Sequence, residues 1–200
     1  MKTVVLLSGG LDSAVVLAMA LRDGEVSALT IDYGQRHRRE IESAKAVADY
    51  YAVPHLVAKV DPAVFGGSAL TCDREVPDGA AVEPDATYVP ARNTVLLALA
   101  TARAESIGAR CIAIGANADD AGGYPDCRRK YLESFREVLL TGTVGHVWLT
   151  APLLGYAKND VVDLARQIGV PIELTWSCYR GGDDPCGTCG ACELRNEAMR

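Results

Sequence analysis

Short apolar runs alternate with longer segments of helical spacing along most of the chain. The apolar runs predict strands over residues 3–7, 26–31, 56–60, 111–115 and 146–151. The helical spacing predicts helices over residues 12–22, 38–51, 93–107, 128–140 and 158–168. Strands rich in Val, Ile and Leu that alternate with helices are typical of a parallel sheet covered on both faces. We therefore predict an α/β fold whose ligands bind beyond the carboxyl ends of the strands.

Two stretches interrupt this alternation. Residues 61–91 carry Gly, Pro and acidic side chains without a clear period. This connection is too long for a plain linker, which predicts a substrate lid or a contact with a partner. From about residue 174 the chain becomes rich in cysteine, glycine and charge. We predict a main domain over residues 1–173 and a small terminal module over residues 174–200.

A glycine-rich turn with the sequence SGGLDS, at residues 8–13, joins the first predicted strand to the first predicted helix. In such a turn, backbone N–H groups and the positive end of the helix dipole point at one spot, which binds phosphate. Glycine lets the backbone approach an anion closely because no Cβ intervenes. Ser8 and Ser13 can add hydroxyl donors, and Asp12 can cap the helix or contact magnesium. The turn is neither a Walker loop nor a dinucleotide fingerprint, because both glycine patterns are absent.

Two more polar segments follow predicted strands. They are Asp32-Tyr33-Gly34-Gln35 after the second strand and residues 117–128 after the fourth. The carboxyl ends of parallel strands meet at one edge of the sheet, so these segments are expected beside the glycine turn. Their coincidence favours a ligand site at that edge over a turn that binds nothing.

Composition and charge limit the classes of partner that the protein is expected to bind. The chain has 200 residues with a formal net charge of −6, and no clustered Lys and Arg that would indicate a nucleic-acid substrate. The basic run at residues 36–39 is interpreted as a solvated helix start. No apolar run approaches the ~20 residues of a membrane span, and the N-terminus leads straight into a strand rather than a signal peptide. We expect no membrane partner and a cytoplasmic location, where cysteines serve as free thiols or metal ligands.

Four of the seven cysteines are clustered near the C-terminus with the spacing Cys-x7-Cys-x2-Cys-x2-Cys. They are Cys178, Cys186, Cys189 and Cys192. Four thiolates suit a closed, tetrahedral, structural zinc site. An iron–sulfur cluster is the alternative, because Cys-x2-Cys-x2-Cys also occurs in bacterial ferredoxins. We favour zinc because the ferredoxin run continues with Cys-x3-Cys-Pro, whereas here the proline precedes the run.

The ordered motifs resemble one family over nearly the whole chain, from about residue 3 to residue 199. SGGLDS resembles the pyrophosphate loop of ATP pyrophosphatases. Further motifs are DYGQRH at 32–37, VPARN at 89–93, GYPDCR at 123–128, APL at 151–153 with Lys158, and TWSCY at 175–179 leading into PCGTCGAC. Together they resemble the 7-cyano-7-deazaguanine synthase family of queuosine and related deazapurine biosynthesis.

This resemblance implies a Rossmann-like sheet of the adenine nucleotide alpha hydrolase type. It implies an ATP-dependent carbon–nitrogen ligase that converts 7-carboxy-7-deazaguanine and ammonia into a nitrile. ATP is cleaved between the α- and β-phosphates, with Mg²⁺ bound to the ATP. The resemblance also implies one structural Zn²⁺ ion and a homodimer.

The resemblance assigns roles to particular positions. Residues implied to bind ATP are Leu7, Ser8, Gly9, Gly10, Leu11, Asp12, Ser13, Ala14, Val15, Asp32 and Tyr33. Residues implied to act in catalysis are Asp12, Ser13, Arg92 and Lys158. Residues implied to bind the substrate are Asp120, Tyr124 and Asp126. The implied metal ligands are Cys178, Cys186, Cys189 and Cys192.

One departure leaves alternatives open. The family usually has Asp-Tyr-Ser where this chain has Asp120-Ala121-Gly122. A relative that uses an acceptor other than ammonia therefore remains an alternative. A second alternative is an RNA-modifying sulfurtransferase that carries sulfur on Cys72 or Cys127. A third is a non-catalytic module built around the four cysteines, which would leave SGGLDS unexplained.

Overall fold

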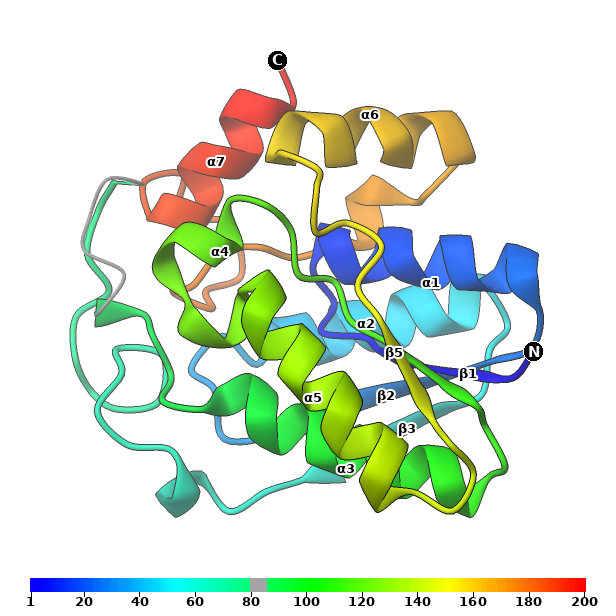
Figure 1. The fold of residues 1–200 in the computed structure, drawn as a ribbon. Helices are drawn as coiled ribbons and strands as arrows, with labels where there is room; N and C mark the ends of the chain where they lie inside the picture. The colour runs from blue at the N-terminus through cyan, green and yellow to red at the C-terminus, as the bar shows by residue number, and fades with distance from the viewer. Residues whose placement is uncertain (80–85) are drawn as a thin grey trace.

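The computed structural model describes residues 1–79 and 86–200. Its centre is a five-stranded sheet with the order β3-β2-β1-β4-β5, in which all neighbouring strands are parallel (Figure 1). The strands are β1 (Thr3–Leu6), β2 (Val26–Asp32), β3 (His55–Lys59), β4 (Cys111–Ala113) and β5 (Trp148–Thr150). The predicted α/β class and parallel sheet are confirmed.

Helices cover both faces of this sheet (Figure 1). One face packs against α1 (Leu11–Asp23), α2 (Arg39–Tyr50) and α6 (Lys158–Ile168). The other packs against α3 (Arg92–Ser106) and α5 (Arg129–Gly142). Further short helices among the described residues are η1 (Pro62–Val64), α4 (Asp120–Gly123), η3 (Pro125–Cys127), η4 (Ile172–Leu174) and α7 (Gly190–Ala198).

Strand β1 shows why the sequence folds this way. Val4 and Leu6 point into the core formed with α3 and α5, whereas Val5 and Leu7 belong to the core formed with α1, α2 and α6. Successive side chains of a strand point to opposite faces, so a strand buried on both sides must be apolar throughout. This is the origin of the continuous apolar runs in the sequence.

The predicted element boundaries agree with the structure to within one or two residues, and two differences are informative. The fifth strand was expected from residue 146, but His146 has a φ of +48° and belongs to a turn, so β5 begins at Trp148. Helix α7 was not predicted. It begins directly after Cys189, in a segment whose glycines and cysteines give a poor helical signal.

The long connection between β3 and α3 packs onto the molecule over its described parts, 61–79 and 86–91. Phe65, Leu70 and Val76 are buried in the core shared with α3 and α5. The ring of Phe65 meets that of Tyr33 edge-on, with 5.2 Å between ring centroids. Residues 80–85, which also belong to the predicted lid, lie outside the described residues. The lid or partner role stays a prediction.

The strand order places a topological switch point between β1 and β4. The chain passes from β1 to β2 and β3 on one side, and later from β4 to β5 on the other. The loops that follow β1 and β4 therefore diverge, which leaves a crevice at the carboxyl ends of these strands. In the described part of the chain, none of the helices combines the length and apolar character needed to cross a bilayer.

Candidate active site

A cavity of about 260 Å³ opens at this switch point. Its walls come from segments far apart in the sequence: the loop after β1, the ends of β2 and β4, and the first residues of α3 and α6. Of the residues predicted to bind ATP, those lining it are Leu7, Ser8, Gly10, Leu11, Asp12, Ser13 and Tyr33. Arg92, Asp120 and Lys158 line it as well. The remaining ATP-binding candidates, Gly9, Ala14, Val15 and Asp32, lie behind this wall.

The glycine loop is held tightly against its neighbours. Gly9 has a φ of +92°, and a Cβ built on it would overlap the carbonyl oxygen of Glu40 in α2. On the opposite side, a Cβ on Gly115 would lie 3.0 Å from the backbone nitrogen of Ser13. The N–H of Trp176 donates to the carbonyl of Gly9 at 2.9 Å. The two glycines therefore allow α2 and the end of β4 to clamp the loop.

The first turn of α1 presents backbone donors to the cavity. Its N-cap is Gly10, which provides no side-chain cap. Ser13 Oγ donates to the carbonyl of Gly10 at 2.9 Å and accepts from the N–H of Ser8 at 3.2 Å. These bonds shape the loop while the N–H groups at the start of α1 face the cavity, where the helix dipole favours an anion.

Replacing Gly9 by alanine is expected to destabilise the fold by at least about 2 kcal/mol. The new Cβ would collide with the backbone of α2, which cannot yield as the end of a flexible side chain can. Gly10→Ala is the matched control, because the nearest atom to its Cβ would be Ser8 Oγ at 3.5 Å, an ordinary contact. Urea unfolding of both variants checks the difference. Equal stabilities would contradict the clamped loop.

Lys158 and Asp12 form an ion pair across the cavity. Lys158 Nζ lies 2.6 Å from Asp12 Oδ2 and 2.9 Å from Oδ1, and the side chains are 19% and 20% exposed. The pair joins the first residue of α6 to the first turn of α1. Two of the predicted catalytic residues are thus brought into direct contact at the anion-binding turn.

Asp120 belongs to a cluster with Asn117 and Asp119, which all line the same cavity. Its Oδ2 accepts from the N–H of Asn117 at 3.1 Å, and Asn117 Oδ1 accepts from the N–H groups of Asp119 and Asp120. Burial and the nearby Asp12 carboxylate raise the pKa of Asp120 to about 6. The nearby Lys158 opposes this shift. Asp119 Oδ2 accepts from the N–H of Lys158 at 2.8 Å, which fixes the start of α6.

Arg92 and Tyr33 lie together deeper in the cavity. Burial opposes the charge of Arg92, but Tyr33 and Glu40 stabilise it, and the net effect raises its pKa. Burial also raises the pKa of Tyr33, whose hydroxyl stays protonated. Arg92 therefore supplies the cavity with a fixed cation that suits a carboxylate or phosphate oxygen.

The segment that follows β2 contains both buried and exposed side chains. Asp32 does not line the cavity; its Oδ2 pairs with Arg38 at 2.9 Å. The interpretation of residues 36–39 as a solvated helix start is wrong for His37, which is 4% exposed. His37 lies against the ring of Tyr179, with ring centroids 5.8 Å apart. The arginines on either side remain at the surface.

Tyr124 and Asp126, two predicted substrate ligands, lie outside the cavity wall. The hydroxyl of Tyr124 lies 2.9 Å from Thr87 Oγ1, and its ring stacks on Tyr88. Asp126 is buried, and its Oδ2 accepts from the backbone N–H of Asn93 at 2.9 Å. This bond satisfies one of the free donors at the start of α3. The geometry shows Asp126 positioning α3, and its contact with substrate stays a prediction.

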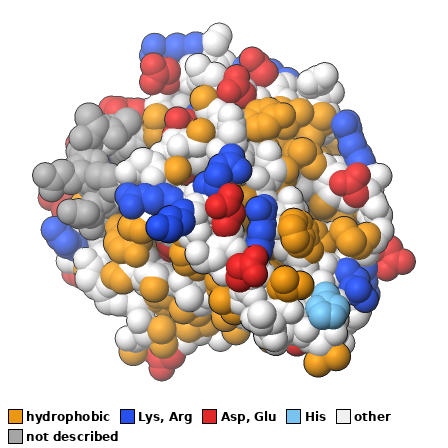
Figure 2. Space-filling view, viewed as in Figure 1, with side chains coloured by type: hydrophobic (Ala, Val, Ile, Leu, Met, Phe, Trp, Pro, Cys, Tyr) orange, Lys and Arg blue, Asp and Glu red, His pale blue; other side chains and the backbone are white. Residues whose placement is uncertain are grey.

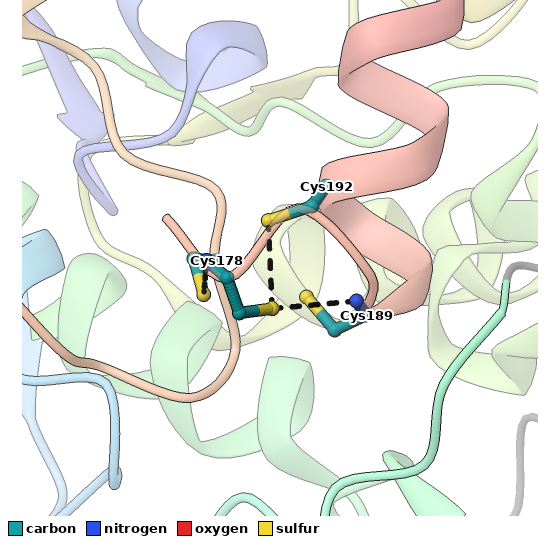
Figure 3. A group of neighbouring side chains, drawn as sticks. Cys178, Cys189 and Cys192 are labelled. Carbon is teal, nitrogen blue, oxygen red and sulfur yellow. Dashed lines mark hydrogen bonds between the residues drawn. The ribbon is translucent and has the colours of Figure 1, made fainter. Parts of the chain in front are cut away.

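The four cysteines converge although they come from different turns. Their sulfur atoms all lie within 4.8 Å of one another. The labelled sulfurs of Cys178, Cys189 and Cys192 point toward one another, with Cys192 at the start of α7 (Figure 3). The N–H of Cys189 points at Cys186 Sγ, 3.3 Å away. Four sulfurs at this separation with N–H donors toward them suit one tetrahedral ion. The predicted metal ligands therefore form a group that can hold a metal.

This cluster is anchored to the rest of the molecule. Trp176 connects it to the glycine loop, because its backbone N–H donates to Gly9 and its Nε1 donates to the carbonyl of Cys178 at 2.9 Å. Arg180 pairs with Asp78 at 2.7 Å in the long connection. Cys178, Cys189 and Cys192 share a core with the sheet. The division at residue 173 stays a prediction, and the last residues pack as part of the same body.

The charges on the face seen in Figure 2 are mixed. Basic and acidic side chains are interspersed there, and hydrophobic side chains lie between them. This distribution agrees with the net charge of −6. Over the described residues seen in this view, the basic side chains do not form a continuous track for a phosphate backbone.

A parallel sheet of this order, with a glycine loop clamped at the switch point, defines an α/β protein of Rossmann-like fold. Solved structures agree. The U34-tRNA thiolase NcsA from Methanococcus maripaludis, with its [4Fe-4S] cluster, is similar with a TM-score of 0.57 and 19% identity, covering 99% of this chain and 64% of that chain. NMN synthetase from Francisella tularensis is similar with a TM-score of 0.53 and 16% identity, covering 91% and 68%. At these identities the likeness shows the fold alone. The present chain spans slightly less than two thirds of the thiolase.

The chain belongs to the family described as queuosine biosynthesis protein QueC, whose model matches residues 2–200. The 7-cyano-7-deazaguanine synthase of Thermoplasma acidophilum is 49% identical over 203 residues, covering 97% of this chain and 85% of that protein. The synthase of Trichormus variabilis is 47% identical over 212 residues, covering 100% and 93%. The resemblance carried by the ordered motifs is thereby confirmed.

Proposed function

We propose that the protein is an ATP-dependent ligase that converts 7-carboxy-7-deazaguanine and ammonia into 7-cyano-7-deazaguanine. The observation that carries this proposal is the pairing of family membership with a donor-rich glycine loop that faces a cavity containing Arg92 and Lys158. A cavity with anion-binding groups at two places can hold the phosphates of ATP and the carboxylate of an acid together. Catalysis then consists of positioning and electrostatic stabilisation, without a protein nucleophile.

The chemistry explains why ATP is needed. A carboxylate is a poor electrophile, because its oxygen is a poor leaving group. Its oxygen attacks the α-phosphorus of ATP, the bond to the β-phosphate oxygen breaks, and pyrophosphate leaves. Ammonia then forms a C–N bond with the adenylated carbon, and AMP departs with the oxygen, which gives an amide. A second nucleotide activates the amide oxygen in the same way, and loss of that oxygen with two protons gives the nitrile.

Residue roles follow from position. Ser8, Gly9, Gly10 and the first turn of α1 hold the departing pyrophosphate. Lys158 neutralises phosphate charge, and Asp12 keeps Lys158 in place or binds the Mg²⁺ that accompanies ATP. Arg92 contacts the acid or its adenylate. Tyr33 flanks the nucleotide from the cavity wall, whereas Asp32 pairs with Arg38 outside that wall.

The base edge of the substrate is assigned to three residues: Asp120, Tyr124 and Asp126. Asp120 is supported by its place on the cavity wall. We place Tyr124 and Asp126 at the edge of the cavity, because neither lines it. Their hydrogen-bond partners are Thr87 and Asn93. We propose zinc as the ion of the four cysteines, since a closed set of four thiolates is a structural site. There it ties the last residues of the chain to the glycine loop.

A sulfurtransferase reaction is disfavoured by the state of Cys127. Burial and nearby carboxylates raise the pKa of its thiol to about 12, so it is protonated at neutral pH. A sulfur carrier needs a thiolate. Cys72 is exposed, and its thiol donates to the carbonyl of Ser68 at 2.9 Å, outside the cavity.

Incubation with ATP, Mg²⁺, ammonium and the carboxydeazaguanine, followed by mass spectrometry, tests the proposal. The expected result is a nitrile product together with AMP and pyrophosphate, which disappears in Asp12→Ala. Conversion of the acid only when another amine replaces ammonium would indicate a different acceptor. Thiolation of a tRNA in place of nitrile formation would overturn the proposal.

A further inference from the structure

Glu40 is a charged residue of the cavity wall to which the roles above give no function. It lies in the first turn of α2 and lines the cavity beside Tyr33 and His37. Its side chain is 15% exposed, and that of His37 is 5% exposed. A carboxylate this deep needs partners in the protein, because burial of an isolated charge is costly.

Gln35 and His37 flank the two oxygens of the carboxylate. Gln35 Nε2 donates to Glu40 Oε1 at 2.9 Å, and His37 Nε2 lies 3.0 Å from Oε2. Gln35 is itself fixed, because its Oε1 accepts from the N–H of Tyr33 at 2.9 Å and its Nε2 also donates to the carbonyl of Ile31. The main-chain carbonyl of Glu40 abuts Gly9. The carboxylate is thereby fixed relative to the glycine loop.

Arginine side chains lie near Glu40, but they do not form an ion pair with it among the described residues. Arg92 lies close enough for its charge to be affected by Glu40. Among the described residues, however, the ion pair recorded for Glu40 is with His37, and none joins it to an arginine or lysine. Arg38 pairs with Asp32, and Arg39 stacks over Trp176. Glu40 and Arg92 therefore both line the cavity, and among the described residues no ion pair joins them.

We infer that Glu40 is the ammonium site of the enzyme, an inference that rests on the proposed amidation. Oε1 of Glu40 accepts from Gln35 and Oε2 lies beside His37 Nε2, which leaves one lone-pair direction on each oxygen for a further donor. Such a group suits a small cation with several N–H donors. A nucleobase edge, by contrast, needs both oxygens side by side and free. The fixed carboxylate also attracts the cationic form that dominates for simple amines at neutral pH.

In this position Glu40 can accept the proton that ammonium must lose before it reacts. Ammonium has no lone pair, so one proton must leave before its nitrogen can attack. Glu40 accepts that proton, the nitrogen forms the C–N bond, and the C–O bond to AMP breaks with its electron pair on AMP. The new amide nitrogen then releases one proton to solvent, which leaves the neutral amide. Arg92, on the same cavity wall, stabilises the negative charge that develops on the carbonyl oxygen.

Glu40→Gln tests the inference, with Glu42→Gln as the matched control. Glu42 lies two residues further along α2, with its side chain 71% exposed. The amide keeps the size of Glu40 and removes its charge. We expect the KM for ammonium to rise about tenfold or more, as for the loss of a charge-assisted hydrogen bond, while the KM values for ATP and the acid change less than twofold. Glu42→Gln is expected to leave all three KM values at the wild-type level.

The outcomes separate the inference from the proposed function. Acid-dependent exchange of labelled pyrophosphate into ATP by the wild-type protein, without ammonium, tests adenylation alone, and its absence would reject both. Where exchange occurs, an unchanged ammonium KM in Glu40→Gln overturns the inference, as does an equal rise of all three values. A rise for the acid alone would assign Glu40 to the base edge and also overturn it. Glu40→Asp, which keeps the charge, should restore part of the ammonium affinity. If the glutamine variant does not fold, a selective rise of the ammonium KM in Glu40→Asp remains the required result.

Discussion

Lys158→Met is expected to lower kcat/KM for ATP about 100- to 1000-fold, which corresponds to about 2.7–4 kcal/mol of transition-state stabilisation. The loss has two causes. Lys158 supplies positive charge where pyrophosphate departs, and its Nζ holds both oxygens of Asp12 at the start of α1. Without it, Asp12 is an unpaired carboxylate at the site where phosphate must bind. Steady-state kinetics with ATP varied, at saturating acid and ammonium, measures the effect.

A second readout distinguishes this role from a general disturbance. Lys158 lowers the pKa of Asp120, which burial and Asp12 raise to about 6. Its removal should raise that pKa further, so the acidic limb of the pH profile should move to higher pH. The matched control is Lys130→Met on the exposed face of α5. Wild-type kinetics in Lys158→Met, or an equal loss in Lys130→Met, would contradict the role.

The sequence predicted the sheet because the central strands β1, β2 and β4 are buried on both faces. Such strands are apolar at most positions, and this leaves a signal that needs no knowledge of the partners. The ends of elements were less certain. The start of β5 depends on the left-handed turn at His146, and helix α7 depends on the cysteines that precede it. Both are decided by tertiary structure rather than by local propensity.

The glycine loop was predictable because its function requires particular residue types in one short segment. The pairing of Asp12 with Lys158 was not, because 146 positions separate them. His37 and Glu40 were missed for a different reason. Their spacing of three positions is visible in the sequence, but they border a basic run that resembles a solvated helix start. Only the fold shows that Gln35, His37 and Glu40 turn inward while the arginines stay outside.

Asp126 shows the limit of assigning roles from motifs. Its motif was expected to read the base edge, yet its carboxylate holds the N–H of Asn93. A charged residue beside a site can serve the site by fixing a helix that carries a functional residue. Arg92 is the first residue of that helix, directly before Asn93. The structure thus connects Asp126 to the cavity through the position of Arg92.

Cys189→Ser is expected to give the largest loss of stability. Cys189 is fully buried, belongs to the core shared with the sheet, and supplies one of four converging sulfurs. Structural zinc sites contribute about 10–16 kcal/mol of apparent binding free energy, which is comparable to the whole stability of a domain. The variant should therefore lose its metal and unfold at a much lower temperature. Metal analysis and thermal unfolding measure both effects.

Cys72→Ser is the control for this prediction, because Cys72 is exposed, lies outside the cluster and donates to a carbonyl that a serine hydroxyl can also reach. It should retain about one zinc ion per chain and the wild-type melting temperature. Hydrogen bonds connect Cys178 through Trp176 to Gly9, which leads to a further prediction. Metal loss should weaken ATP binding, since the backbone donor that holds the glycine loop comes from the cysteine segment. A Cys189→Ser protein that keeps both its stability and its ATP affinity would contradict this coupling, and a brown wild-type protein containing iron would contradict zinc.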